Sequence, residues 1–165
     1  MTYESDHISF RALEMGKAAE HLVCADLLIG GHQAFLSDQG LPYDVLVDMG
    51  QRILRVQVKA TSASRNAQSA SKAPNDVYQF YVRRRGRDGT GERLSEVHCD
   101  IVALVALDIR VVAYFLVSEL AQSVSLKPPG HDFSRLYRRR RMAPIDAYPF
   151  ADALARLEGG SLSAD

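Results

Sequence analysis

The chain has 165 residues, 47% of them hydrophobic and 24% charged, and 20 lysines and arginines balance 20 aspartates and glutamates. These values are typical of a globular protein and exclude an overall basic bias, so any contact with nucleic acid must come from local clusters of charge. The length predicts one domain, residues 1–158, followed by a disordered tail, residues 159–165.

Cysteine usage and hydropathy indicate a cytoplasmic protein. Cys24 and Cys99 provide neither a disulfide framework nor zinc-finger spacing, so both are predicted to be reduced thiols. The first ten residues lack a basic region followed by an apolar run, so no signal peptide is expected. The most apolar stretch, residues 101–117, is interrupted by Asp108 and Arg110, which favours two buried strands over a membrane span.

A long amphipathic segment lies near the start of the chain. Residues 1–8 are interpreted as a loose leader. From Ser9 to Ile29 apolar residues then recur about every 3.6 positions, which predicts a helix capped by Ser9 and ended by Gly30-Gly31. Glu20 is expected at the edge of the apolar stripe of this helix.

The stretch from Pro42 to Ala60 predicts two strands joined by a tight turn. Both flanks alternate and are rich in branched residues, and Gly50 suits the first position of a two-residue hairpin turn. A turn at that position places Asp44 opposite Gln57. Strand periodicity puts Gln57 and Lys59 on one face, so a carboxylate, an amide and an ammonium group are expected to converge at one end of the hairpin.

The remaining segments predict further strands and short helices. Residues 61–76, rich in small and polar residues, are predicted to form a mobile loop, and residues 118–122 a short helix. The other predicted elements are strands at 32–37, 77–82, 101–107 and 111–117 and a helix at 150–157. One helix, a strand-rich middle and short C-terminal helices together indicate an α/β domain built around a mixed sheet.

The order of the polar residues resembles a known motif. Glu20 in GKAAE on the helix, Asp44 in PYDVLVD at a strand, and Gln57-Val58-Lys59 in VQVKA on the next strand are similar to the motif of the PD-(D/E)XK nuclease superfamily. Within that superfamily, the chain most resembles the group typified by bacterial group I intron homing endonucleases, in which Gln replaces the second acid.

The resemblance implies both a fold and an activity. It covers residues 14–62, and residues 99–117 are similar to the later core strands of that group. The implied fold is a restriction-endonuclease-like core, a central mixed β-sheet flanked by helices. The implied activity is metal-dependent hydrolysis of phosphodiester bonds in double-stranded DNA, with Mg²⁺ or Mn²⁺ as cofactor. A homo-oligomer, a dimer or tetramer, is expected because one domain offers one catalytic site and both strands need cutting.

The resemblance also implies a role for each residue of the motif. Asp44 would be the central metal ligand, with the amide oxygen of Gln57 and the backbone carbonyl of Val58 as further ligands. Glu20 would supply a carboxylate directly or through water. Lys59 would orient or activate the attacking water, or stabilise charge on the phosphate. Because Gln57 carries no negative charge, weaker metal binding is expected than with the usual acid.

Each of these residues also has a structural alternative. Asp44 could begin a strand at a solvated turn, and Glu20 could be an ordinary surface acid of a helix. Gln57 and Lys59 could be exposed polar positions of a half-buried strand. Asp100 is interpreted as the cap of a strand, with a role in the site as its alternative.

Two arginine-rich runs are the strong basic clusters of the sequence, and both are candidates for DNA binding. Phosphate contacts require Arg or Lys whatever the base sequence, whereas the alternative is a plain solvated face. Arg55, on the same predicted face as Gln57, is interpreted as structural or phosphate-facing. The runs comprise Arg83, Arg84, Arg85 and Arg87, and Arg138, Arg139, Arg140 and Arg141.

Three other functions stay open on the sequence alone. They are a Holliday-junction-resolvase-like or restriction-like nuclease, a non-catalytic nucleic-acid-binding module with the same fold, and a protein that keeps only the fold for interaction. Cleavage of branched against linear DNA separates the first from a homing-like enzyme, and metal binding separates nucleases from the other two.

Overall fold

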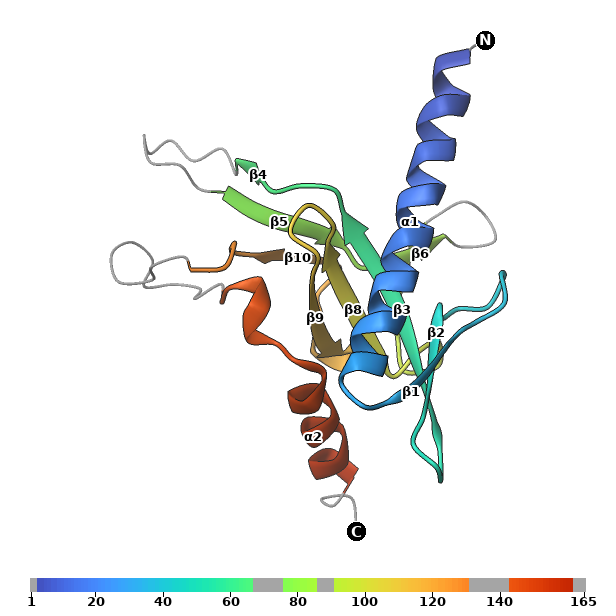
Figure 1. The fold of residues 1–165 in the computed structure, drawn as a ribbon, viewed down its shortest axis with the longest axis vertical. Helices are drawn as coiled ribbons and strands as arrows, with labels where there is room; N and C mark the ends of the chain where they lie inside the picture. Colours follow the sequence, from blue (N-terminus) through green and yellow to red (C-terminus); the bar gives the residue numbers. More distant parts are fainter. Residues whose placement is uncertain (1–2, 67–75, 86–90, 131–142, 162–165) are drawn as a thin grey trace.

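A 27-residue helix, α1 (Tyr3–Ile29), opens the chain and lies across a five-stranded sheet (Figure 1). The computed structural model describes residues 3–66, 76–85, 91–130 and 143–161. The strands are β1 (Gln33–Leu36), β2 (Val45–Asp48), β3 (Ile53–Thr61), β4 (Arg65–Asn66), β5 (Asp76–Tyr81), β6 (Arg83–Arg85), β7 (Gly91–Arg93), β8 (Ile101–Ala106), β9 (Val111–Leu116) and β10 (Ser123–Leu126). Two 3-10 turns, η1 (Val117–Glu119) and η2 (Ile145–Ala147), and a second helix, α2 (Phe150–Ser161), are the other elements.

The main sheet is mixed, as the sequence predicts. Its strand order is β1-β2-β3-β8-β9, with β3 and β8 parallel and every other neighbouring pair antiparallel. A smaller sheet has the order β10-β5-β4, and β6 pairs with β7. The parallel pairing of β3 with β8 joins the N-terminal hairpin to the C-terminal strands, so the predicted central mixed sheet flanked by helices is confirmed.

The β2–β3 hairpin has the predicted register. Val45 pairs with Val56, and the N–H of Met49 donates to the carbonyl of Arg52 over 2.9 Å, which closes a two-residue turn. Gly50 has φ +81° in this turn, a conformation that costs glycine little and a residue with a side chain much more. The turn therefore fixes which side chains of β2 and β3 lie opposite each other.

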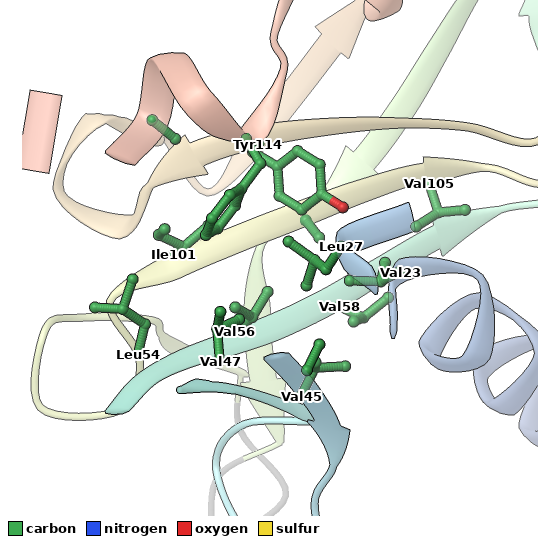
Figure 2. Packing of buried hydrophobic residues seen from close by; sticks show 14 of the residues in the cluster. Val23, Leu27, Val45, Val47, Leu54, Val56, Val58, Ile101, Val105 and Tyr114 are labelled. Carbon is green, nitrogen blue, oxygen red and sulfur yellow. The ribbon is translucent and has the colours of Figure 1, made fainter. Parts of the chain in front are cut away.

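Both long helices cover the same face of the main sheet. Val23 and Leu27 of α1 pack against valines of β2 and β3, and Phe150 of α2 reaches the same cluster at Tyr114 (Figure 2). The opposite face is covered by apolar residues of β5, β10 and η2. All six residues of β8 are buried, because its alternate side chains enter the cores on the two faces. The two strands predicted between residues 101 and 117 are therefore largely buried, as expected. No helix in the described ranges has the length and apolarity to span a membrane.

Arg55 links β3 to the segment that precedes β8 through an ion pair and hydrogen bonds. Its guanidinium is bound to both carboxylate oxygens of Asp100, with Nη2 2.9 Å from Oδ1 and Nε 3.2 Å from Oδ2, and Nη1 donates to the carbonyl of Val97 over 2.8 Å. The backbone N–H of Arg55 also donates to Asp100 Oδ2 over 2.7 Å. The structural interpretation of Arg55 holds, and Asp100 is its partner at the start of the strand.

Removing this guanidinium should destabilise the protein. We expect Arg55→Met to lower the free energy of unfolding by about 1.5–3 kcal/mol, the range for hydrogen bonds to charged groups, because a half-buried carboxylate loses its partner. Urea unfolding followed by circular dichroism measures the change. Arg52→Met is the matched control, because the pair of Arg52 with Glu158 is exposed and loose, with 4.0 Å between Nη2 and Oε1. This substitution should change the free energy of unfolding by less than about 0.5 kcal/mol.

Several predicted boundaries are wrong. The helix begins at Tyr3, so residues 3–8 are not a loose leader; they contain no Pro or Gly, and acids at a helix start are favourable. The helix predicted at residues 118–122 is only the 3-10 turn η1, which ends at Glu119. The chain then enters β10, which pairs with β5. Part of the predicted loop 61–76 is the short strand β4, and residues 67–75 lie outside the described residues. At the other end, α2 continues past 157 to Ser161, and residues 162–165 are outside the described part.

Candidate active site

Asp44 stands immediately before β2, where it meets two neighbours on β3. One carboxylate oxygen, Oδ2, accepts the backbone N–H of Val58 over 2.7 Å and a hydrogen bond from the side-chain amide of Gln57. The same amide nitrogen lies 3.3 Å from the Val58 carbonyl oxygen. The hairpin register places these groups together, as the sequence predicts, and the Val58 carbonyl points into the same polar cluster.

Glu20 brings a second carboxylate to this cluster from α1. It is half-buried, and its negative charge acts on Asp44. Burial raises the pKa of Asp44 above its ordinary value of 3.8, and repulsion from Glu20 adds to the increase. The Val58 N–H, Lys59 and Lys17 oppose this increase by stabilising the ionised form. Two acids with mutual repulsion and partial burial form a place where a cation would be stabilised.

Lys59 follows Gln57 by two residues on β3 and therefore projects from the same face. Its side chain is largely removed from water, and this burial lowers the pKa of its ammonium below 10.5, while the charge of Asp44 acts in the opposite direction. Nearby Cys99 is fully buried, and its burial raises the pKa of the thiol to about 12. Cys99 is therefore a protonated thiol at neutral pH and does not serve as a nucleophile.

The predicted site residues Glu20, Asp44, Gln57 and Lys59 are therefore brought together at one end of the hairpin. Sequence reasoning missed Lys17, whose Nζ lies 2.8 Å from Glu20 Oε2. The signal was its position three residues before Glu20, one helical turn away, but such spacing is common on helix surfaces.

The donors of the cluster fit a hard divalent cation. Carboxylates of Asp44 and Glu20, the Val58 carbonyl and the Gln57 amide supply oxygens, the atoms that Mg²⁺ prefers. Gln57 presents its nitrogen to Asp44, so ligation through its oxygen would require the amide to rotate. In the described ranges no group of three or more His, Cys, Asp or Glu residues is placed to hold a metal ion, so the candidate set is mixed, with an amide and a carbonyl beside the two acids.

The arginine candidates lie on other elements. Arg83 and Arg84 belong to strand β6, which pairs with β7. Arg83 is exposed, whereas Arg84 is half-buried and 3.8 Å from Glu92, the residue opposite it in the hairpin. Arg85 ends this strand, and the predicted sites at Arg87, Arg138, Arg139, Arg140 and Arg141 lie outside the described residues.

The fold is similar to a solved nuclease structure. The structure of the bacterial homing endonuclease I-Ssp6803I matches with a TM-score of 0.59 and 19% sequence identity, covering 92% of this chain and 96% of that chain. At this identity the match establishes a shared nuclease fold. No protein-family model matches the chain, and no curated protein matches it.

Proposed function

We propose that this protein is a metal-dependent DNA endonuclease that hydrolyses phosphodiester bonds and resembles homing endonucleases. The observation that carries the proposal is the meeting of Asp44, Gln57 and Lys59 at one end of the β2–β3 hairpin, with Glu20 facing them from α1. The similar fold of a bacterial homing endonuclease supports it. By the same reasoning the protein belongs to the PD-(D/E)XK superfamily in the variant with Gln at the second acid.

In this proposal Asp44 and Glu20 hold Mg²⁺ or Mn²⁺, with Gln57 and the Val58 carbonyl as additional oxygen donors. When bound, the ion polarises the phosphate and lowers the pKa of a coordinated water. The backbone N–H of Val58 fixes the orientation of Asp44, because it donates to the carboxylate oxygen over 2.7 Å. Asp44 therefore needs little rearrangement to act as a ligand.

Lys59 then acts on the reacting phosphate or on the water. Because its ammonium is largely buried, its charge is screened less than that of a surface lysine. An ammonium in such a place stabilises negative charge that develops on the phosphate, and its lowered pKa makes it a better partner for a water that must lose a proton. The negative charge of Asp44 attracts this ammonium.

Binding of double-stranded DNA is proposed to use exposed arginines, of which Arg83 on β6 is a described example. The protein would act in the cytoplasm as a homo-oligomer, because each chain offers one such site and a double-strand break requires two cuts. The arginine run at 138–141 remains a candidate for the same role.

The test is nicking of supercoiled plasmid by the purified protein. We expect nicked and then linear DNA with Mg²⁺ or Mn²⁺ and none with EDTA, because the site requires a divalent cation to hold the phosphate. Gel electrophoresis measures the products, and linear and branched oligonucleotides in parallel distinguish a homing-like from a junction-resolving enzyme.

Circular dichroism on the same preparation shows whether the protein is folded, so that absence of cleavage is not caused by unfolding. A folded protein that binds DNA but nicks none of the substrates with either metal would contradict the proposal. That result, together with no binding of Mn²⁺, would instead favour a non-catalytic nucleic-acid-binding module.

A further inference from the structure

Lys17 lies on α1, three residues before Glu20, and approaches the candidate site from this helix. Its Nζ lies 2.8 Å from Glu20 Oε2, and its charge also acts on Asp44. The lysine side chain is 43% exposed, whereas that of Glu20 is 19% exposed. Lys17 is therefore the more solvent-exposed partner of the pair.

The Lys17–Glu20 pair contributes little to the helix itself. On helices, an acid that precedes a base along the chain is more favourable than the reverse order, and here the base comes first. Solvent around the 43% exposed lysine also weakens the attraction between the two charges. The position of Lys17 is therefore better explained by the charges that it neutralises than by the stability of α1.

The charges of the site balance without a metal. The carboxylates of Glu20 and Asp44 face the ammonium groups of Lys17 and Lys59. A divalent cation that binds Glu20 must share this carboxylate with Lys17 or displace it. Lys59 is half-buried on β3, whereas the Lys17 side chain is 43% exposed, so Lys17 is the group that can move away more easily.

We propose that Lys17 is the counter-ion of the metal-free site, a positioning residue that competes with the divalent cation for Glu20 and so sets the cation affinity. This inference rests on the proposed function, because it assumes that Glu20 and Asp44 hold the ion. On cation binding the ammonium of Lys17 moves off Glu20 toward solvent, where it becomes available to a phosphate of the DNA. The competition weakens cation binding until DNA is present.

The test measures Mn²⁺ binding to the full chain without DNA, by isothermal titration calorimetry at low ionic strength. We expect Lys17→Met to bind Mn²⁺ roughly three- to tenfold more tightly than wild type, because a competing charge is lost from one ligand. Lys17→Arg keeps the charge and should bind as wild type does. Arg11→Met removes a charge from the same helix about 9 Å farther along its axis and should change little.

Four results would overturn the inference, and one of them separates it from the proposed function. Equal or weaker Mn²⁺ binding by Lys17→Met than by wild type would overturn the inference. The proposed metal site would still stand in that case if wild-type protein binds Mn²⁺ and Asp44→Asn does not. An equal gain in Arg11→Met would show a general field effect and no competition at Glu20. A gain in Lys17→Arg as large as that in Lys17→Met would show that charge is not the cause. No Mn²⁺ binding by folded wild-type protein would overturn the metal site and the inference together.

Discussion

Asp44→Asn should abolish metal-dependent cleavage and make the metal-free protein more stable. A bound ion supplies several kcal/mol of stabilisation to the charge of the transition state, and each 1.36 kcal/mol corresponds to a factor of ten in rate. Loss of Asp44, the proposed central ligand, should therefore reduce cleavage to below roughly one thousandth of the wild-type rate. DNA affinity should change little, because Asp44 is not part of the basic surface.

The gain in stability follows from the raised pKa of Asp44. A carboxyl whose pKa is raised on folding stabilises the folded state below its ordinary pKa, and that contribution is lost as the pH rises through the folded pKa. At neutral pH the buried charge is therefore unfavourable, and asparagine removes it while it can still accept the N–H of Val58. We expect a higher Tm for Asp44→Asn than for wild type at pH 7. The gain should shrink as the pH falls toward 4.

Plasmid nicking and thermal unfolding in EDTA at pH 4, 5.5 and 7 measure both effects. Asp48→Asn is the matched control: Asp48 is exposed at the hairpin turn, where its Oδ1 accepts the N–H of Gly50 over 2.7 Å. This control should retain cleavage and should show no rise in Tm. Cleavage by Asp44→Asn at the wild-type rate would remove Asp44 from the site.

Lys59→Met should separate catalysis from metal binding. We expect cleavage to fall about 100- to 1,000-fold, because the proposed site loses the ammonium that stabilises charge on the phosphate. Binding of Mn²⁺ should be kept or become tighter, since a positive charge leaves the vicinity of Asp44. Single-turnover cleavage and calorimetry on the same variant measure the two properties.

Lys59→Arg is the variant that tests the kind of contribution. It keeps the charge, but its guanidinium does not lose a proton, so a role in activating water predicts a loss similar to that of Lys59→Met. A role limited to charge predicts that most of the activity is kept. Unchanged cleavage by Lys59→Met would leave Lys59 a structural residue of the strand.

The parts of the site that could be predicted are those fixed by local geometry. A glycine turn sets the register of β2 and β3, so the proximity of Asp44 and Gln57 follows from the positions of a few residues. The electrostatic effect of Glu20 on Asp44 depends on how α1 packs against the sheet, which the helical pattern alone does not determine. Glu20 is predicted as a site residue because the order of the polar residues resembles the nuclease motif.

The parts that could not be predicted depend on tertiary partners. β10 has only four residues, and what makes it a strand is its pairing with β5, far away in the sequence. Arg84 becomes part of a strand because the segment that carries Glu92 folds back beside it. Lys17 lacks any distinctive sequence signal, and its relation to the site becomes evident only when Asp44 is placed next to α1.

The division of the site between a hairpin and a helix has a consequence for its dynamics. Asp44, Gln57 and Lys59 belong to one short-range unit, whereas Glu20 reaches them only while α1 stays docked through residues such as Val23 and Leu27. Partial undocking of α1 would leave three of the four groups in place and remove one carboxylate. Native-state opening of this helix is thus a route by which the proposed metal site would lose one carboxylate without unfolding of the sheet.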